Sequence, residues 1–176
     1  MRAFKVLMAT MALTTIGVMP AAAQEAGTVG LTLASESTVG LTIQATGRIA
    51  VRPEVGFTRS TSEGTGSGGK RTTSSWSPGL SLLFYVKSWD NTRLYLSPRW
   101  LYSSLTSADA ASSFESKATG NAVSAMLGAQ HNITERFAAF GEVGIGRSSS
   151  KSDSGLSSSS SNFWSTRSTV GAIVFF

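Results

Sequence analysis

Apolar side chains alternate with small or charged ones along most of the chain, and this period of two constrains the fold more than any other feature. In residues 48–59, Ile49, Val55 and Phe57 share one parity, whereas Arg52 and Glu54 share the other. Successive side chains of a β-strand point to opposite faces, so this segment predicts a strand with one apolar face. The same alternation recurs in residues 76–87, 94–102, 122–130, 137–147 and 163–176. The sequence therefore predicts an all-β protein.

The spacing of these segments predicts an antiparallel up-and-down order. Two shorter candidate strands, residues 28–34 and 38–43, bring the total to eight, and a tight turn at 35–37 joins them. Three short turns are expected at 44–47, 89–92 and 132–135, and three long Ser- and Gly-rich loops at 60–75, 106–121 and 148–162. Because proline lacks the amide donor of a sheet ladder, bulges are expected at Pro53, Pro78 and Pro98.

The first 23 residues predict a secretory signal peptide rather than part of the fold. A basic start is followed by an apolar run and by Ala21-Ala22-Ala23, which suits cleavage before Gln24. Residues 24–176 then form one domain. Cleavage removes Arg2 and Lys5, so 15 basic residues fall to 13 against 10 acidic ones, and the net charge falls from +5 to +3. These charges are scattered along the chain, and no nucleic-acid partner is expected.

Composition excludes several kinds of site. The chain has no cysteine and a single histidine, so disulfides and thiolate metal sites are excluded and neither a metal nor a cofactor is expected. The predicted mature segment contains no apolar run long enough for a membrane helix. If the mature chain crosses a membrane, it must do so as a closed barrel, because only helices and closed sheets satisfy every backbone group in lipid.

The C-terminal strand carries a further pattern. Thr169, Gly171, Val174 and Phe176 are spaced as in the C-terminal signature that directs bacterial outer-membrane barrels to their insertion machinery, which this segment resembles. Together with the signal peptide, the alternating strands and the unequal loops, it makes residues 24–176 resemble the small eight-stranded outer-membrane barrels of the OmpA-like, OmpX and OmpW type. The resemblance implies an eight-stranded antiparallel transmembrane β-barrel in the outer membrane of the Gram-negative cell envelope. It also implies contact with outer-membrane lipid and lipopolysaccharide, and recognition by the insertion machinery.

In such a barrel the apolar face of each strand meets lipid and the polar face fills the lumen. The inward parity predicts a lumen charge network of Arg52, Glu54, Lys87, Arg99, Glu142 and Arg167. Eight strands leave an interior just wide enough for side chains, and buried charges have to pair. We therefore expect the two glutamates to pair with Arg52, Arg99 and Arg167 and to plug the lumen.

Three functions are compatible with this architecture. A non-enzymatic role in envelope structure or surface interaction is favoured, with the polar loops as the site of any extracellular ligand. A small-solute channel is the alternative. A lipid-modifying enzyme is the third possibility; the chain offers it only His131, which stands at the turn end of its strand without a serine two residues on.

Overall fold

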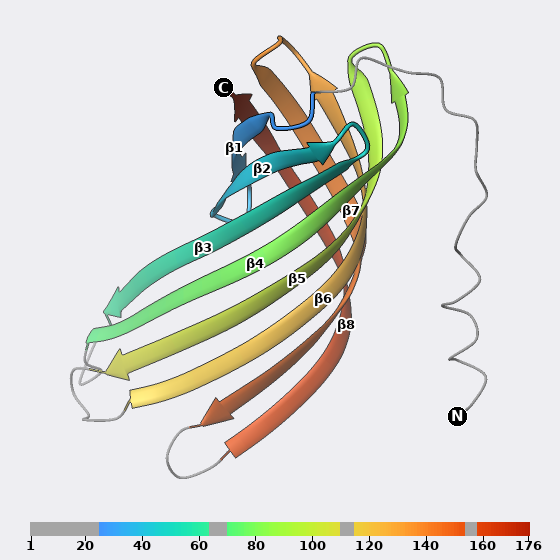
Figure 1. The fold of residues 1–176 in the computed structure, drawn as a ribbon. Coiled ribbons are helices and arrows are strands. Elements are labelled where there is room, and N and C mark those ends of the chain that lie inside the picture. The colour runs from blue at the N-terminus through green and yellow to red at the C-terminus, as the bar shows by residue number, and fades with distance from the viewer. Residues whose placement is uncertain (1–24, 64–69, 110–114, 154–157) are drawn as a thin grey trace, which may run out of the picture.

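A computed structural model describes residues 25–63, 70–109, 115–153 and 158–176. These residues form a closed barrel in which each strand pairs antiparallel with its neighbour in sequence and β1 closes onto β8 (Figure 1). The eight strands are β1 (Val29–Ala34), β2 (Thr38–Thr46), β3 (Ile49–Glu63), β4 (Lys70–Trp89), β5 (Thr92–Asp109), β6 (Glu115–Asn132), β7 (Phe137–Asp153) and β8 (Ser158–Phe175). The predicted all-β, eight-stranded up-and-down barrel is confirmed. The predicted signal peptide lies outside the described residues.

The barrel is apolar outside, and its interior combines many polar side chains with two apolar clusters. Val143 and Ile145 of β7 are each 59% exposed, whereas Glu142, which directly precedes Val143, is buried. The same alternation places Val123 and Leu127 of β6 outside. Aromatic rings mark both ends of this apolar surface, with Phe57, Trp76 and Trp164 toward one end and Trp89, Phe137 and Phe176 toward the other. Such a surface with aromatic borders is suited to lipid. None of the described residues forms a helix with the length and hydrophobicity needed to cross a bilayer.

The six strands β3–β8 are much longer than the predicted segments. β4 has 20 residues and β5, β6 and β8 have 18 each, although a tilted strand crosses the apolar layer with about 10. The predicted long loops at 60–75, 106–121 and 148–162 are therefore mostly strand, which corrects that prediction. Their Ser- and Gly-rich composition suggested loops, but backbone ladders continue through it; Thr61, for example, pairs with Thr72.

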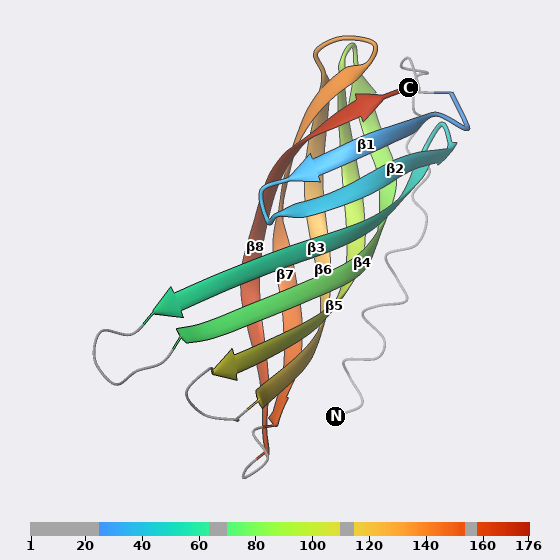
Figure 2. The same cartoon turned by 90° about the vertical axis from the view of Figure 1, so that its left-hand side faces the viewer.

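The first hairpin is short, as predicted, and this makes the barrel wall uneven. β1 ends at Ala34, and Ser37 closes the turn to β2 with a φ of 55°. Pairing of β2 with β3 stops at Gly56, and pairing of β1 with β8 stops at Gly171. Figure 2 shows this hairpin covering only the part of the wall near the C-terminus, while β3 and β8 continue past it. Within the described residues, the far parts of β3 and β8 have no sheet partner on the hairpin side.

The prolines do not produce the expected bulges. Gly40–Glu54 and Ile43–Val51 flank Pro53 in one uninterrupted register, and the same holds for the pairs around Pro78 and Pro98. Instead, two consecutive residue pairs are missing from one ladder beside each proline. Because proline has no amide donor, it interrupts the hydrogen bonds of the ladder without inserting an extra residue. The register shifts lie elsewhere, between Gln44 and Thr46 and between Tyr85 and Lys87.

Candidate functional site: the lumen

An ion pair spans the lumen between β3 and β7. Arg52 Nη2 lies 2.6 Å from Glu142 Oε1, and both side chains are almost completely buried. Tyr95 of β5 donates its hydroxyl to the same carboxylate oxygen at 2.8 Å. The Arg52 guanidinium also lies over the ring of Phe140, with Cζ 5.0 Å from its centroid. Three separate strands therefore meet at one carboxylate in the middle of the barrel.

A second network lies around Arg99 of β5. Its Nε and Nη2 donate to the two carboxylate oxygens of Glu54 at 2.6 and 3.1 Å, which is the bidentate geometry that makes arginine–carboxylate pairs strong. Ser81 donates to Glu54 at 3.2 Å. Arg99 Nη1 also donates to Glu36, in the β1–β2 turn, at 3.2 Å. The short hairpin is thus tied to the opposite wall.

Toward the short turns the lumen is filled by rings and aliphatic groups. The Arg93 guanidinium lies on the Tyr85 ring, with Cζ 3.4 Å from its centroid, and it donates to the carbonyl of Gly47 at 3.1 Å. Tyr85 donates to Gln130 at 3.0 Å. An apolar cluster packs beside this layer and consists of Ala138, Phe140, Ile173 and Phe175. The lumen is therefore occupied through successive layers from these turns to Arg99.

The structure brings together four of the six residues of the predicted charge network. Arg52 pairs with Glu142, and Arg99 pairs with Glu54. Arg167 also lies on the lumen side but forms a hydrogen bond to Ser148 and no ion pair with either glutamate. The predicted pairing of Arg167 is therefore wrong, because Arg52 and Arg99 already occupy the two carboxylates.

Lys87 does not lie in the lumen. Tyr85 pairs with Tyr95 but Lys87 pairs with Leu94, so Val86 is an extra residue that shifts the parity of β4 by one. Lys87 is consequently exposed, and its ammonium lies 4.7 Å from the centroid of the Trp89 ring. Period-two counting along a strand cannot detect such a shift without knowledge of the partner strand.

Arg93, Tyr85 and Glu36 take part in the polar contacts of the lumen but lie outside the predicted network. Arg93 stands one residue before the predicted start of its strand, although it shares the parity of Tyr95 and Arg99 and could have been found by extending the alternation. Tyr85 shares the inward parity of Ser81, so the same alternation could have found it too. Glu36 lies in a turn, and nothing local indicates that its carboxylate reaches Arg99.

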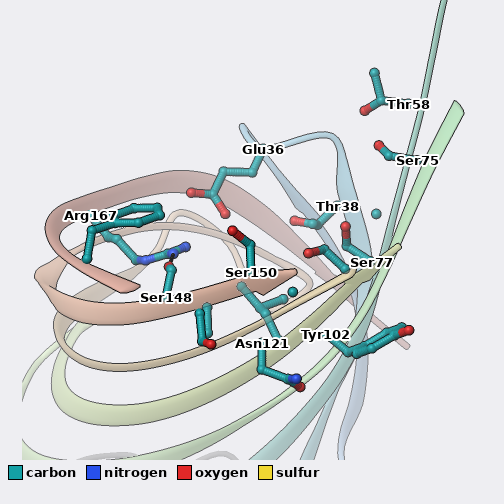
Figure 3. Close-up of a pocket in the computed structure, with 17 residues that line it drawn as sticks. Glu36, Thr38, Thr58, Ser75, Ser77, Tyr102, Asn121, Ser148, Ser150 and Arg167 are labelled. Carbon is teal, nitrogen blue, oxygen red and sulfur yellow. Dashed lines mark hydrogen bonds between the residues drawn. The ribbon is translucent and has the colours of Figure 1, made fainter. Parts of the chain in front are cut away.

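Beyond Arg99, toward the long tips, lies a cavity of about 400 Å³, which we call the outer cavity. Short polar side chains dominate its lining, including Thr38, Ser77, Asn121 and Ser150 (Figure 3). Glu36 and Arg167 are the charged side chains among the described residues that line it. Glycine at inward positions 56 and 120 and serine around them leave this space open.

The other predicted site residues lie outside the lumen network. In β8, Thr169 is buried, Val174 is 42% exposed and Phe176, one residue beyond the strand, is 76% exposed. The close packing of Gly171 against Phe140 leaves no space for a Cβ atom. His131 is exposed, and its Nδ1 lies 2.8 Å from the hydroxyl of Thr92. Among the described residues, no group of three histidine, cysteine or acidic side chains is arranged to hold a metal ion.

Comparisons with known proteins give the fold. No protein-family model matches the sequence, and no curated protein matches it either. A major outer membrane protein from Thermus thermophilus superimposes with a TM-score of 0.53 at 13% identity, over 85% of this chain and 99% of that one. CarO of Acinetobacter baumannii gives a TM-score of 0.43 at 12% identity, and the attachment invasion locus protein Ail of Yersinia pestis gives 0.46 at 15%. Each of the latter two matches covers 85% of this chain, and they cover 97% and 94% of the respective proteins. The similarity to the Thermus protein shows that this chain has the fold of an outer-membrane β-barrel.

Proposed function

We propose that this chain is a non-enzymatic outer-membrane protein whose lumen is closed by its own side chains, and that it serves the envelope structurally or through its outer surface. The observation that carries the proposal is the pair of salt bridges Arg52–Glu142 and Arg99–Glu54, which link different strands across the lumen at successive levels. Because a charge left alone in such an interior is poorly solvated, the pairs oppose opening.

The arrangement of the lumen disfavours a channel. A solute passing through would have to separate both ion pairs and displace the Arg93–Tyr85 stack. Catalysis has equally little support, since His131 contacts a threonine hydroxyl rather than a carboxylate and lies away from the lumen groups. The proposed partners are accordingly lipid and lipopolysaccharide along the apolar wall and the insertion machinery at Thr169, Gly171, Val174 and Phe176. An extracellular ligand would bind at the exposed end of the barrel.

Solute uptake by proteoliposomes tests this function. Vesicles containing the purified protein should swell in an isotonic monosaccharide solution no faster than protein-free vesicles, while vesicles with a general porin serve as the positive control. Swelling at a rate that rises with the amount of this protein would show an open lumen and favour the small-solute channel instead.

A further inference from the structure

The outer cavity contains a cation, Arg167, that has no acidic partner among the described residues. Arg167 Nη2 donates to Ser148 Oγ at 2.8 Å, and its Nε is buried with no hydrogen-bond partner among the described residues. Figure 3 shows Arg167 and Ser148 together on one wall of the cavity. A Cβ atom at Gly146 would lie 2.9 Å from this Nε, so the glycine leaves room for the guanidinium. A half-buried arginine whose buried Nε has no partner among the described residues is suited to a carboxylate or a phosphate group.

Apart from Arg167, the polar side chains of the lining present hydroxyl groups, the Asn121 amide and one carboxylate. Thr38 Oγ1 is buried and has no hydrogen-bond partner among the described residues. Glu36 shares Arg99 with Glu54, so two carboxylates meet one guanidinium at the floor of the cavity. The excess of negative charge at that end favours ligand groups that donate hydrogen bonds. The cavity therefore has one region for an anionic group and a separate region for hydroxyl groups.

The cavity lining reaches a gap in the barrel wall. Because pairing with the short hairpin stops at Gly56 on β3 and at Gly171 on β8, no described strand lies between the far parts of β3 and β8. Thr58 of β3 and Phe163 of β8 both line the cavity. Outside this gap, Phe57 and Trp164 are among the most exposed aromatic residues. A ligand could therefore arrive from the external solution or from the lipid surface.

We propose that the outer cavity binds a sugar that carries a carboxylate or a phosphate. Arg167 holds the anionic group, and Glu36, Thr38 and the neighbouring serines form hydrogen bonds with the sugar hydroxyls. The two sources of this chemistry are a free acidic sugar and the phosphorylated sugar head group of a lipid. The proposal is independent of the closed lumen, since the cavity lies on the outer side of both ion pairs.

Binding is tested with ¹⁵N-labelled protein in nanodiscs of zwitterionic lipid, titrated with glucuronate and, in parallel, with glucose. Glucuronate should shift the Arg167 side-chain resonance and the amide resonances of Ser148 and Thr38 saturably. Glucose should bind at least about tenfold more weakly, because it lacks the charge that Arg167 recognises. This comparison requires no variant. A second series of nanodiscs containing lipid A tests the lipid source.

The matched variants are Arg167→Gln and Arg147→Gln, which lie on adjacent strands. Arg147 is exposed on the outer face, so its replacement should leave binding unchanged, whereas R167Q should weaken it at least about tenfold. Shifts with lipid A alone that R167Q abolishes would support the site and identify the lipid as its source. If neither glucuronate nor lipid A shifts the cavity resonances, or if R167Q binds as tightly as the unmodified protein, the proposal is overturned.

Discussion

The effect of replacing an inward-facing charged residue of this barrel depends more on its ion-pair partner than on how deeply the residue is buried. Glu142 accepts hydrogen bonds from Arg52 Nη2 and from Tyr95, while Arg52 Nε and Nη1 have no hydrogen-bond partner among the described residues. Removal of the carboxylate would leave a buried guanidinium with no counter-ion. Loss of one member of a buried pair is therefore expected to cost more than loss of both.

Glu142→Gln should destabilise the folded barrel by about 3 kcal/mol, since it removes the counter-ion of Arg52 while keeping the side-chain volume. Urea unfolding in lipid vesicles measures this change. Glu135→Gln, in an exposed turn, should leave the free energy of unfolding within about 0.5 kcal/mol of that of the unmodified protein. Adding Arg52→Met to Glu142→Gln should recover part of the loss. Equal midpoints for the two glutamate variants would mean that Glu142 is not paired in the lumen.

Two glycines on neighbouring strands, Gly128 of β6 and Gly141 of β7, should respond differently to replacement by alanine. A Cβ atom at Gly128 would overlap the ring of Tyr95, while a Cβ at Gly141 would meet nothing within 4 Å. Gly128→Ala is therefore expected to destabilise the barrel by about 1–3 kcal/mol through overpacking, and Gly141→Ala should be close to neutral. The same urea measurement compares them. A neutral Gly128→Ala would contradict the position of the Tyr95 ring.

At the scale of strands, the sequence predicts which faces meet lipid but not where strands end. The alternation of apolar and polar residues is a local property, and it correctly predicts Leu82, Val143 and Val174 as outward positions. Strand length depends on the neighbouring strand, whose backbone groups continue the ladder regardless of side chain. Ser- and Gly-rich sequence therefore gave no sign of the long extensions of β3–β8.

The charge network of the lumen was likewise predictable only in part. Parity placed Arg52, Glu54, Arg99 and Glu142 inside, and the need of buried charges for counter-ions indicated that they pair. Which arginine meets which glutamate depends on contacts between strands 45 and 90 residues apart in sequence, so Arg167 could not be excluded. The position of Lys87 depends on a bulge that becomes visible only in the pairing of β4 with β5.

Insertion of a charge into the apolar wall tests its contact with lipid. Leu82→Arg should destabilise the barrel by about 2–4 kcal/mol if Leu82 lies near the bilayer midplane, because the guanidinium would face hydrocarbon. Thr119→Arg, exposed on the extension of β6, should have little effect. Unfolding in lipid vesicles measures both variants. A Leu82→Arg barrel as stable as the unmodified protein would mean that this face does not contact lipid.

The last strand is expected to carry information for assembly as well as structure. Phe176 is exposed and its backbone amide donates to the carbonyl of Val29, so its ring adds little to the packing of the lumen. Deletion of Phe176 should reduce the yield of the protein in the outer membrane of cells more than it reduces refolding in detergent. The two yields are measured by heat-modifiable mobility on gels. An unchanged yield in cells would remove support for its role as an insertion signal.

As a whole molecule, the barrel combines a closed inner half with an open outer half. Rings, ion pairs and aliphatic groups fill the part that the short hairpin completes, and the longer strands continue beyond it around the outer cavity. This division separates two kinds of property. On the proposed function, we expect stability and permeability to depend on the filled inner half and recognition of external molecules to depend on the outer half.

Electrical recording from the protein in planar lipid bilayers tests most directly whether the lumen is closed. The unmodified protein should show no stable openings at moderate voltage. A variant in which Arg52, Glu54, Tyr85, Arg93, Arg99 and Glu142 are all replaced by serine should conduct, because neither the two ion pairs nor the Arg93–Tyr85 stack would then close the lumen. Stable, ohmic openings of the unmodified protein that these six substitutions do not change would contradict a lumen closed by these side chains.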